Sequence, residues 1–194
     1  MNQENHSGAR SAADQLAEPE PLPLLTTKLY RPPITPDLEQ RTRLLARLDQ
    51  RRHRPLTLIS APAGYGKTML ASMWLESCGC PSAWLSLDKG DNDLPTFVRY
   101  LLAAVLGAFP TLELKTSLLD APTVASVPVL ARYLLNDLAQ IKDRFILALD
   151  DVQVIQDQAI LDLLGELLLH PLSSMHLVLI GRRDPPLPIA SLRA

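Results

Sequence analysis

Short apolar runs alternate along this chain with longer segments whose apolar residues recur every three or four positions. The runs have the length of buried strands and lie at Leu56–Ser60, Ala83–Leu87, Phe145–Leu149 and Leu177–Ile180. The helical patterns lie at Lys67–Glu76, Pro95–Ala108, Val127–Ile141 and Gln158–Leu169. Because parallel strands need long crossover connections, this alternation predicts an α/β domain with helices on both faces of a mainly parallel sheet.

The two ends of the ordered pattern are marked by composition. Residues 1–24 are rich in Ala, Glu, Pro and Ser and have little periodicity, so we predict a disordered leader there. Thr35, Pro36 and Asp37 supply a capping hydroxyl, a first-turn proline and a first-turn acid, which predicts the start of a helix running to about Gln50. Residues 25–194 are therefore expected to form one folded domain.

Composition excludes several classes of protein. Apolar residues make up 47% of the chain and the net charge is −2, which argues against a broad surface for nucleic acid or anionic lipid. The longest apolar run, residues 100–109, is too short to span a bilayer, and no apolar segment follows the polar N-terminus as a secretory signal would. Cys78 and Cys80 are too few for a zinc site and too close for an unstrained disulfide. We expect a cytoplasmic protein with no membrane partner.

The first candidate site is a phosphate-binding loop between the first strand and the helix that follows it. Its residues are Ala61, Pro62, Ala63, Gly64, Tyr65, Gly66, Lys67 and Thr68. In such a loop the inward backbone amides and the helix N-terminus cradle the β-phosphate of a nucleotide. Lys67 is expected to reach the β- and γ-phosphates, and the Thr68 hydroxyl to ligate Mg²⁺. The ligand predicted for these eight residues is a purine nucleoside triphosphate, Mg·ATP.

The loop departs from the strict motif G-x-x-x-x-G-K-[ST] at one position. Ala61 stands where the motif has its first glycine. Alanine is the smallest replacement, so the turn is expected to survive. The alternative is a chance Gly-Lys-Thr at a loop-to-helix junction, which the strand before it and the helix after it disfavour.

The second candidate site is a pair of acids at the end of the third strand. Asp150 and Asp151 directly follow the apolar run Phe145–Leu149, at the edge of an α/β sheet where ligands bind. We predict that Asp150 binds Mg²⁺, directly or through water, and that Asp151 polarises the attacking water. The alternative is a solvated turn or a helix cap. Aspartate is one methylene shorter than the glutamate often used in this role, so turnover is expected to be slow.

An arginine follows the fourth strand at the same edge. Arg182 comes directly after Leu177–Ile180 and Gly181 and is predicted to approach the γ-phosphate. The alternative is that Arg182 pairs with Asp184 or with solvent.

Taken together, these segments resemble the N-terminal nucleotide-binding domain of MalT-like, LuxR-family transcriptional regulators, which belong to the STAND class of P-loop ATPases. The resemblance extends from about residue 24 to residue 194 and rests on residues 25–33, 41–45, 60–68, 83–88, 91–93, 149–151 and 182–188. Ala61 is typical of that family. The resemblance supports reading the loop as a Walker A motif and the acids as a Walker B motif in an AAA ATPase-like, three-layer sandwich.

The resemblance also implies a mechanism and a strand order. ADP favours a closed resting form, ATP with an inducer favours self-association, and hydrolysis resets the switch. It places Arg41 near the adenine and implies the strand order 5-1-4-3-2. Family members continue with a fifth strand, a helical lid, a repeat-built sensor and a helix-turn-helix. Since this chain ends at Ala194, we expect the fifth strand and the DNA-binding domain to be missing from it.

The function expected from these features is an ATP-binding switch module with at most weak ATPase activity. One alternative is a free-standing P-loop ATPase or a small-molecule kinase, although no arginine-bearing lid follows the third strand. Another is a truncated fragment that has lost nucleotide binding, which the intact Lys67, Thr68 and Asp150 disfavour. A GTPase is disfavoured because the chain has no Asn-Lys-x-Asp sequence.

Overall fold

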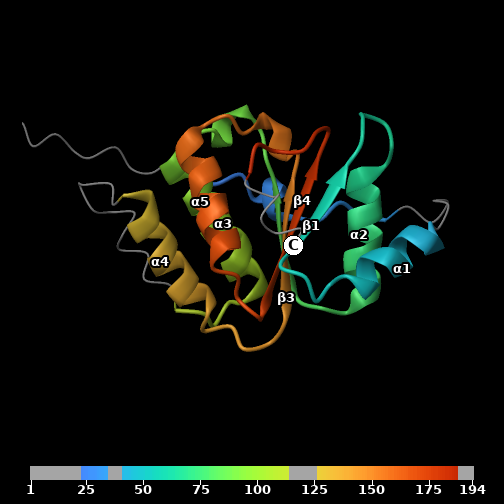
Figure 1. Ribbon diagram of the computed structural model, residues 1–194, viewed down its shortest axis with the longest axis horizontal. Helices are drawn as coiled ribbons and strands as arrows, with labels where there is room; N and C mark the ends of the chain where they lie inside the picture. Colours follow the sequence, from blue (N-terminus) through green and yellow to red (C-terminus); the bar gives the residue numbers. More distant parts are fainter. Residues whose placement is uncertain (1–22, 35–40, 114–125, 188–194) are drawn as a thin grey trace, which may run out of the picture.

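The computed structural model describes residues 23–34, 41–113 and 126–187, and these residues form helices around one parallel sheet (Figure 1). The strands are β1 (Leu56–Ser60), β2 (Ser82–Ser86), β3 (Phe145–Asp150) and β4 (Met175–Gly181). Their order is β1-β4-β3-β2, and every pairing is parallel. The predicted α/β class is confirmed, and the order agrees with the 1-4-3-2 part of the order that the resemblance implied.

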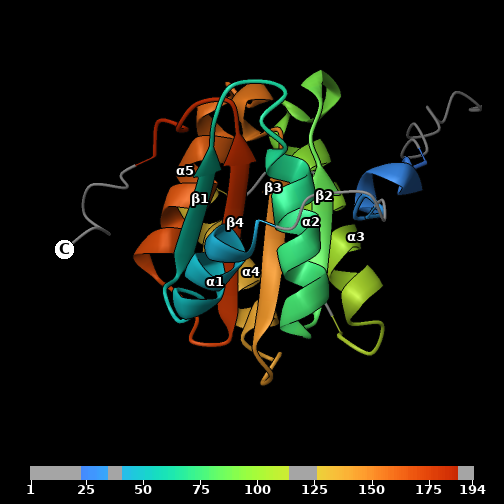
Figure 2. The same cartoon turned by 90° about the vertical axis from the view of Figure 1, so that its right-hand side faces the viewer.

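Helices cover both faces of the sheet (Figures 1 and 2). The α-helices are α1 (Thr42–Gln50), α2 (Lys67–Cys78), α3 (Leu94–Ala108), α4 (Val127–Leu138) and α5 (Gln158–Leu169). Short 3-10 helices are η1 (Thr26–Leu29), η2 (Lys89–Asp91) and η4 (Val152–Val154). Helices α1 and α2 lie on one face, whereas α3, α4 and α5 lie on the other. The result is a three-layer sandwich.

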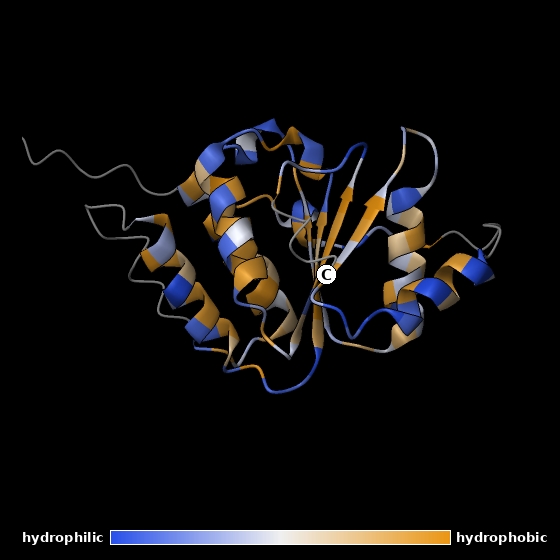
Figure 3. Ribbon diagram, viewed as in Figure 1, coloured by the Kyte–Doolittle hydropathy of each residue, from blue (hydrophilic) through white to orange (hydrophobic). Residues whose placement is uncertain are grey.

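The two central strands are buried along their whole length, as their continuous apolar sequence requires (Figure 3). Successive side chains of a strand point to opposite faces, so Leu147 and Leu149 of β3 pack in the core beneath α3, α4 and α5. Ile146 and Ala148 pack on the other face with Trp74 of α2. This double burial fixes where β3 ends and therefore where its terminal acids lie.

Several predicted boundaries need correction. The predicted helix start at Thr35 lies outside the described residues, and α1 begins only at Thr42 because Arg41 has ψ 61°, which is not helical. Helix α4 ends at Leu138 rather than at residue 141, and β2 begins one residue earlier than predicted. Residues 1–22 of the predicted leader also lie outside the described residues, so the leader and the domain boundary stay predictions. Within the described ranges, no helix is long and apolar enough to cross a membrane.

The two edge strands, β2 and β1, differ in what lies beside them. Beside β2 runs the segment 23–34, which we call the strap, and its helix η1 contacts that strand. Strand β1 pairs only with β4, and no fifth strand occurs among the described residues. Among the described residues, β1 is thus the edge strand with no element recorded on its outer side.

A buried ion pair fastens the strap to the domain. The Lys28 ammonium lies 2.7 Å from the carboxylate of Asp91, which is fully buried, and 2.8 Å from that of Asp88. It also lies 4.6 Å from the centre of the Tyr100 ring, whose hydroxyl accepts a hydrogen bond from the Leu25 backbone. The strap is thereby joined to η2 and α3.

Replacing Lys28 with methionine should destabilise the fold, because it leaves the Asp91 carboxylate buried without its cation. We expect Lys28→Met to lower the free energy of unfolding by about 3 kcal/mol, as is typical when one partner of a buried pair is removed. Urea denaturation measures the change. The matched control is Lys89→Met on the exposed side of η2, which should stay within about 0.5 kcal/mol of wild type. Equal losses for both variants would contradict a specific role for Lys28.

Candidate functional site

The loop between β1 and α2 adopts a conformation that depends on two glycines. Gly64 has φ 82° and Gly66 has φ 69°, both in the left-handed region that other residues avoid. Gly66 is also the N-cap residue of α2, so the loop passes directly into the helix N-terminus. Ala61 has no positive φ. The backbone at the position where the sequence departs from the strict motif therefore does not require glycine.

Two cationic side chains lie on this loop. The Lys67 ammonium, from the first residue of α2, donates to the Pro62 carbonyl at 3.1 Å and so bridges the two ends of the loop. The Arg41 guanidinium donates to the Tyr65 carbonyl at 2.8 Å and passes close to Gly66, where an added Cβ would lie 3.5 Å from it. A positive potential at a helix N-terminus favours an anionic ligand.

Asp150 lies at the tip of β3, and the residue is only 5% exposed. Its carboxyl accepts a hydrogen bond from the backbone N–H of Asp151 at 2.9 Å and interacts with the Thr68 hydroxyl in the first turn of α2. Burial raises the pKa of Asp150, and the charge of Asp151 adds to this, whereas the Thr68 hydroxyl and the charge of Lys67 act in the opposite direction. A divalent cation placed here would stabilise the charged carboxylate.

Gln153, which the sequence analysis missed, bonds to both residues of the predicted catalytic pair, Asp151 and Arg182. Asp151 accepts a hydrogen bond from the side-chain amide of Gln153 at 2.8 Å. The side-chain carbonyl of Gln153 accepts one from the backbone N–H of Arg182 at 2.9 Å. The feature of the sequence that could have singled out Gln153 is its polarity within the otherwise apolar segment Val152–Ile155. A turn after a strand does not by itself need a polar residue at this position.

The structure thus brings every predicted site residue to the carboxyl edge of the sheet. The loop residues 61–68, Asp150, Asp151, Arg182 and Arg41 lie there, and their roles stay predictions. The described part of the chain holds no group of three or more His, Cys, Asp or Glu side chains arranged to bind a metal. Mg²⁺ commonly takes one or two protein ligands and completes its shell with water and substrate phosphates. Thr68 and Asp150 are the residues that would hold it.

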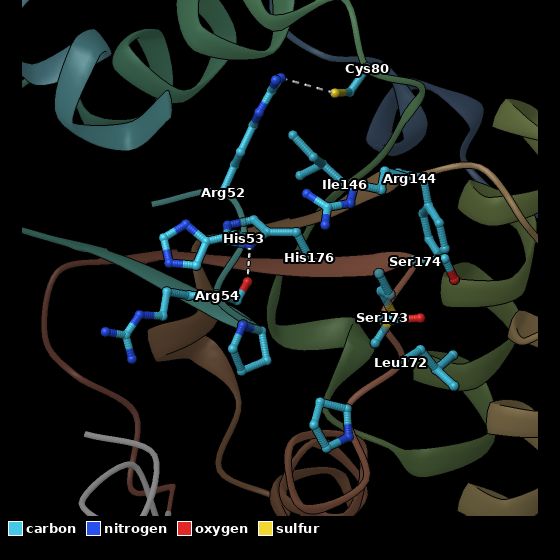
Figure 4. Close-up of a pocket in the computed structure, with 14 residues that line it drawn as sticks. Arg52, His53, Arg54, Cys80, Arg144, Ile146, Leu172, Ser173, Ser174 and His176 are labelled. Atoms are coloured by element: carbon cyan, nitrogen blue, oxygen red, sulfur yellow. Dashed lines mark hydrogen bonds between the residues drawn. The ribbon is translucent and has the colours of Figure 1, made fainter. Parts of the chain in front are cut away.

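A separate cavity of about 310 Å³ opens at the opposite edge of the sheet, where the strands begin (Figure 4). Arg52, Arg54 and Arg144 line it together with the buried His176. Both ring nitrogens of His176 are satisfied, by the Arg54 carbonyl and by the Thr57 hydroxyl. The cavity contains neither the glycine loop nor the paired acids, so it is not the candidate nucleotide site.

Comparison with known proteins supports the predicted resemblance. The chain is 36% identical over 171 residues, which is 88% of its length, to the HTH-type transcriptional regulator MalT of Klebsiella pneumoniae subsp. pneumoniae. It is 34% identical over 171 residues to MalT of Serratia proteamaculans. The aligned region is only 19% of the length of these relatives. The resemblance to MalT-like regulators is confirmed for this region, and no family model matches the chain.

One of the solved structures that the chain matches has only a low similarity to it. It is a chain in the structure of Drosophila ORC bound to poly(dA/dT) DNA, which has a TM-score of 0.40 and 12% sequence identity. The match covers 78% of this chain and 24% of that one. At this level the likeness bears on neither the ligand nor the function of this chain.

The raised pKa of Asp150 predicts how stability depends on pH. The folded protein holds this proton more tightly than the unfolded chain, so its contribution to the free energy of unfolding falls as pH rises through the folded-state pKa. We expect Asp150→Asn, without nucleotide, to be more stable than wild type at pH 7, with the difference shrinking toward pH 4. Urea denaturation across this range checks it, with the exposed Asp143→Asn as control. A variant less stable than wild type at pH 7 would refute this reading of Asp150.

Proposed function

We propose that this chain is the Mg·ATP-binding module of a MalT-like, LuxR-family transcription regulator of the STAND class. The observation that carries the proposal is the glycine loop with Gly64 and Gly66 at positive φ, which passes directly into the N-terminus of α2. The buried Asp150 carboxyl at the end of β3 lies beside the first turn of that helix, which supports a shared ligand. The resemblance to MalT over most of the chain supports the same function.

Nucleotide binding would use the loop and its cations. The backbone amides of residues 61–68 would surround the β-phosphate, and Lys67 would leave the Pro62 carbonyl to reach the phosphate oxygens. Arg41 already lies on the loop and would stay beside the nucleotide, with the adenine as its proposed neighbour. Thr68 and Asp150 would hold Mg²⁺, which neutralises charge on the β- and γ-phosphates.

Slow hydrolysis is the proposed activity of the bound state. Asp151 would polarise a water molecule for attack on the γ-phosphate, and the exposed Arg182 would approach the charge that develops there. Both residues lie at the tips of adjacent central strands, which supports their acting on the same group. The shorter reach of aspartate makes a weak ATPase the expected outcome.

The cellular role rests on the relatives. They are HTH-type transcriptional regulators, and this chain matches only 19% of their length. We propose that the module switches between ADP- and ATP-bound forms in the cytoplasm and that the ATP-bound form self-associates. Strand β1, which pairs only with β4 among the described residues, would supply one surface for such association.

Removing the loop lysine tests nucleotide binding. Lys67→Ala should weaken ATP binding at least about tenfold, because hydrogen bonds from a charged donor contribute about 1.5–3 kcal/mol. Fluorescence titration with a labelled ATP analogue measures it, with unlabelled ATP, ADP and GTP as competitors. Lys89→Ala removes an exposed lysine elsewhere and should bind as wild type does.

Two results would count against the proposal. If folded Lys67→Ala binds ATP as tightly as Lys89→Ala, the loop is not the phosphate site. If GTP competes as well as ATP does, the proposed adenine preference is wrong, whereas the loop remains the phosphate site when Lys67→Ala binds neither nucleotide.

A further inference from the structure

We propose that Gln153 is a positioning residue for ATP hydrolysis, because its carboxamide joins Asp151 to the end of β4 that carries Arg182. This inference rests on the proposed function and assigns a role to a residue outside both nucleotide-binding motifs. The Gln153 side chain would fix the position of Asp151, which polarises water, relative to Arg182, which approaches the γ-phosphate.

Both ends of the Gln153 carboxamide are engaged. Its Nε2 donates to Oδ1 of Asp151 at 2.8 Å, and its Oε1 accepts from the backbone N–H of Arg182 at 2.9 Å. The first contact spans two residues and could belong to a local turn. The second spans 29 residues and links the segment after β3 to the end of β4. If Gln153 only capped a local turn, its hydrogen bond to the Arg182 backbone would not be needed.

The backbone around Gln153 is shaped for this arrangement. Asp151 has φ 58° and ψ 36°, and it is the only residue other than glycine with positive φ among those described. Such a conformation costs about 1 kcal/mol or more and persists only where the surroundings enforce it. Its backbone N–H donates to Oδ1 of Asp150 and its carboxylate accepts from Gln153, so Asp151 is held through both its backbone and its side chain.

Gly181, the last residue of β4, makes room for the carboxamide. A Cβ added there would lie 3.1 Å from Oε1 of Gln153 and 3.0 Å from Cγ2 of Val152. Both contacts are tighter than ordinary van der Waals packing. The absence of a side chain at this position therefore lets Gln153 reach the Arg182 backbone.

Holding Oδ1 of Asp151 leaves its other carboxylate oxygen for water. Within the described ranges, the only hydrogen bond to the Asp151 carboxylate is the one from Gln153. In the proposed step, Oδ2 accepts a proton from water as the water oxygen bonds to the γ-phosphorus. The bond between that phosphorus and the bridging oxygen breaks, which gives ADP and inorganic phosphate, and the proton passes on to solvent.

Two replacements separate the two ends of the carboxamide. Gln153→Glu keeps an acceptor for the Arg182 N–H but opposes the Asp151 carboxylate with a second one. Gln153→Met has similar length and loses both hydrogen bonds. The matched control is Gln156→Glu, three residues along the same segment and exposed. The full 194-residue chain is used throughout.

We expect both Gln153 variants to bind ATP within about twofold of wild type while the hydrolysis rate at saturating ATP falls about tenfold or more, equivalent to about 1.4 kcal/mol in the barrier. The Arg182 amide should exchange its hydrogen slowly in wild type and Gln153→Glu and about tenfold faster in Gln153→Met, since only methionine lacks the acceptor. Gln156→Glu should match wild type in all three measurements.

The outcomes separate this inference from the proposed function. Hydrolysis at the wild-type rate in both Gln153 variants overturns it, as does an Arg182 amide whose exchange is the same in Gln153→Met as in wild type. A wild-type chain that binds ATP and hydrolyses none also overturns it, while leaving the proposed binding intact. A folded wild-type chain that binds no ATP overturns the proposed function itself.

Discussion

The burial of β3 on both faces is the constraint on which the arrangement of this edge of the sheet depends, and it places the Asp150 carboxyl beside the Thr68 hydroxyl. β3 is buried on both faces between β2 and β4, so its sequence and packing determine where it ends, and it ends on a residue that is 5% exposed. The crossover helix α2 begins at the same edge because β1 runs parallel to β4 and β3. In a parallel sheet, the N-terminus of a crossover helix and the carboxyl end of a central strand therefore lie at the same edge, although the two segments are far apart in the sequence.

Two of the buried acids, Asp91 and Asp150, show which acid stabilises the fold and which belongs to the candidate site. Asp91 is fully buried and lies 2.7 Å from the Lys28 ammonium, so its charge is neutralised within the fold and serves to fasten the strap. Asp150 forms no ion pair within salt-bridge distance of any described cation, and burial raises its pKa. A fold that keeps an unneutralised acid beside a phosphate-type loop carries a cost that a bound cation would remove. This contrast is the physical basis for proposing Mg²⁺ at Asp150 and Thr68.

Local patterns were sufficient to predict most of the fold. β1 and α5 have the bounds that their apolar periods indicated, and the glycine loop lies between a strand and a helix as its sequence requires. The errors came from tertiary context: Arg41 breaks the predicted first helix, and its side chain lies on the loop. Gln153 could not be singled out, because its contact with Arg182 spans 29 residues and depends on Gly181 having no side chain. The contacts of the strap could not be predicted either, because Lys28 meets Asp88 and Asp91 only through the tertiary arrangement of the strap beside the segment between β2 and α3.

The central claim is that this edge binds a nucleotide together with Mg²⁺ through Asp150, and its most direct test is the Mg²⁺ dependence of ATP affinity. Calorimetric titration of ATP would be made with Mg²⁺ and with EDTA, on wild type and on Asp150→Asn. The account predicts that Mg²⁺ tightens ATP binding by about tenfold or more in wild type, which is about 1.4 kcal/mol, and that Asp150→Asn loses most of this gain. ATP binding that is unaffected by Mg²⁺, or a gain that survives in Asp150→Asn, would contradict it.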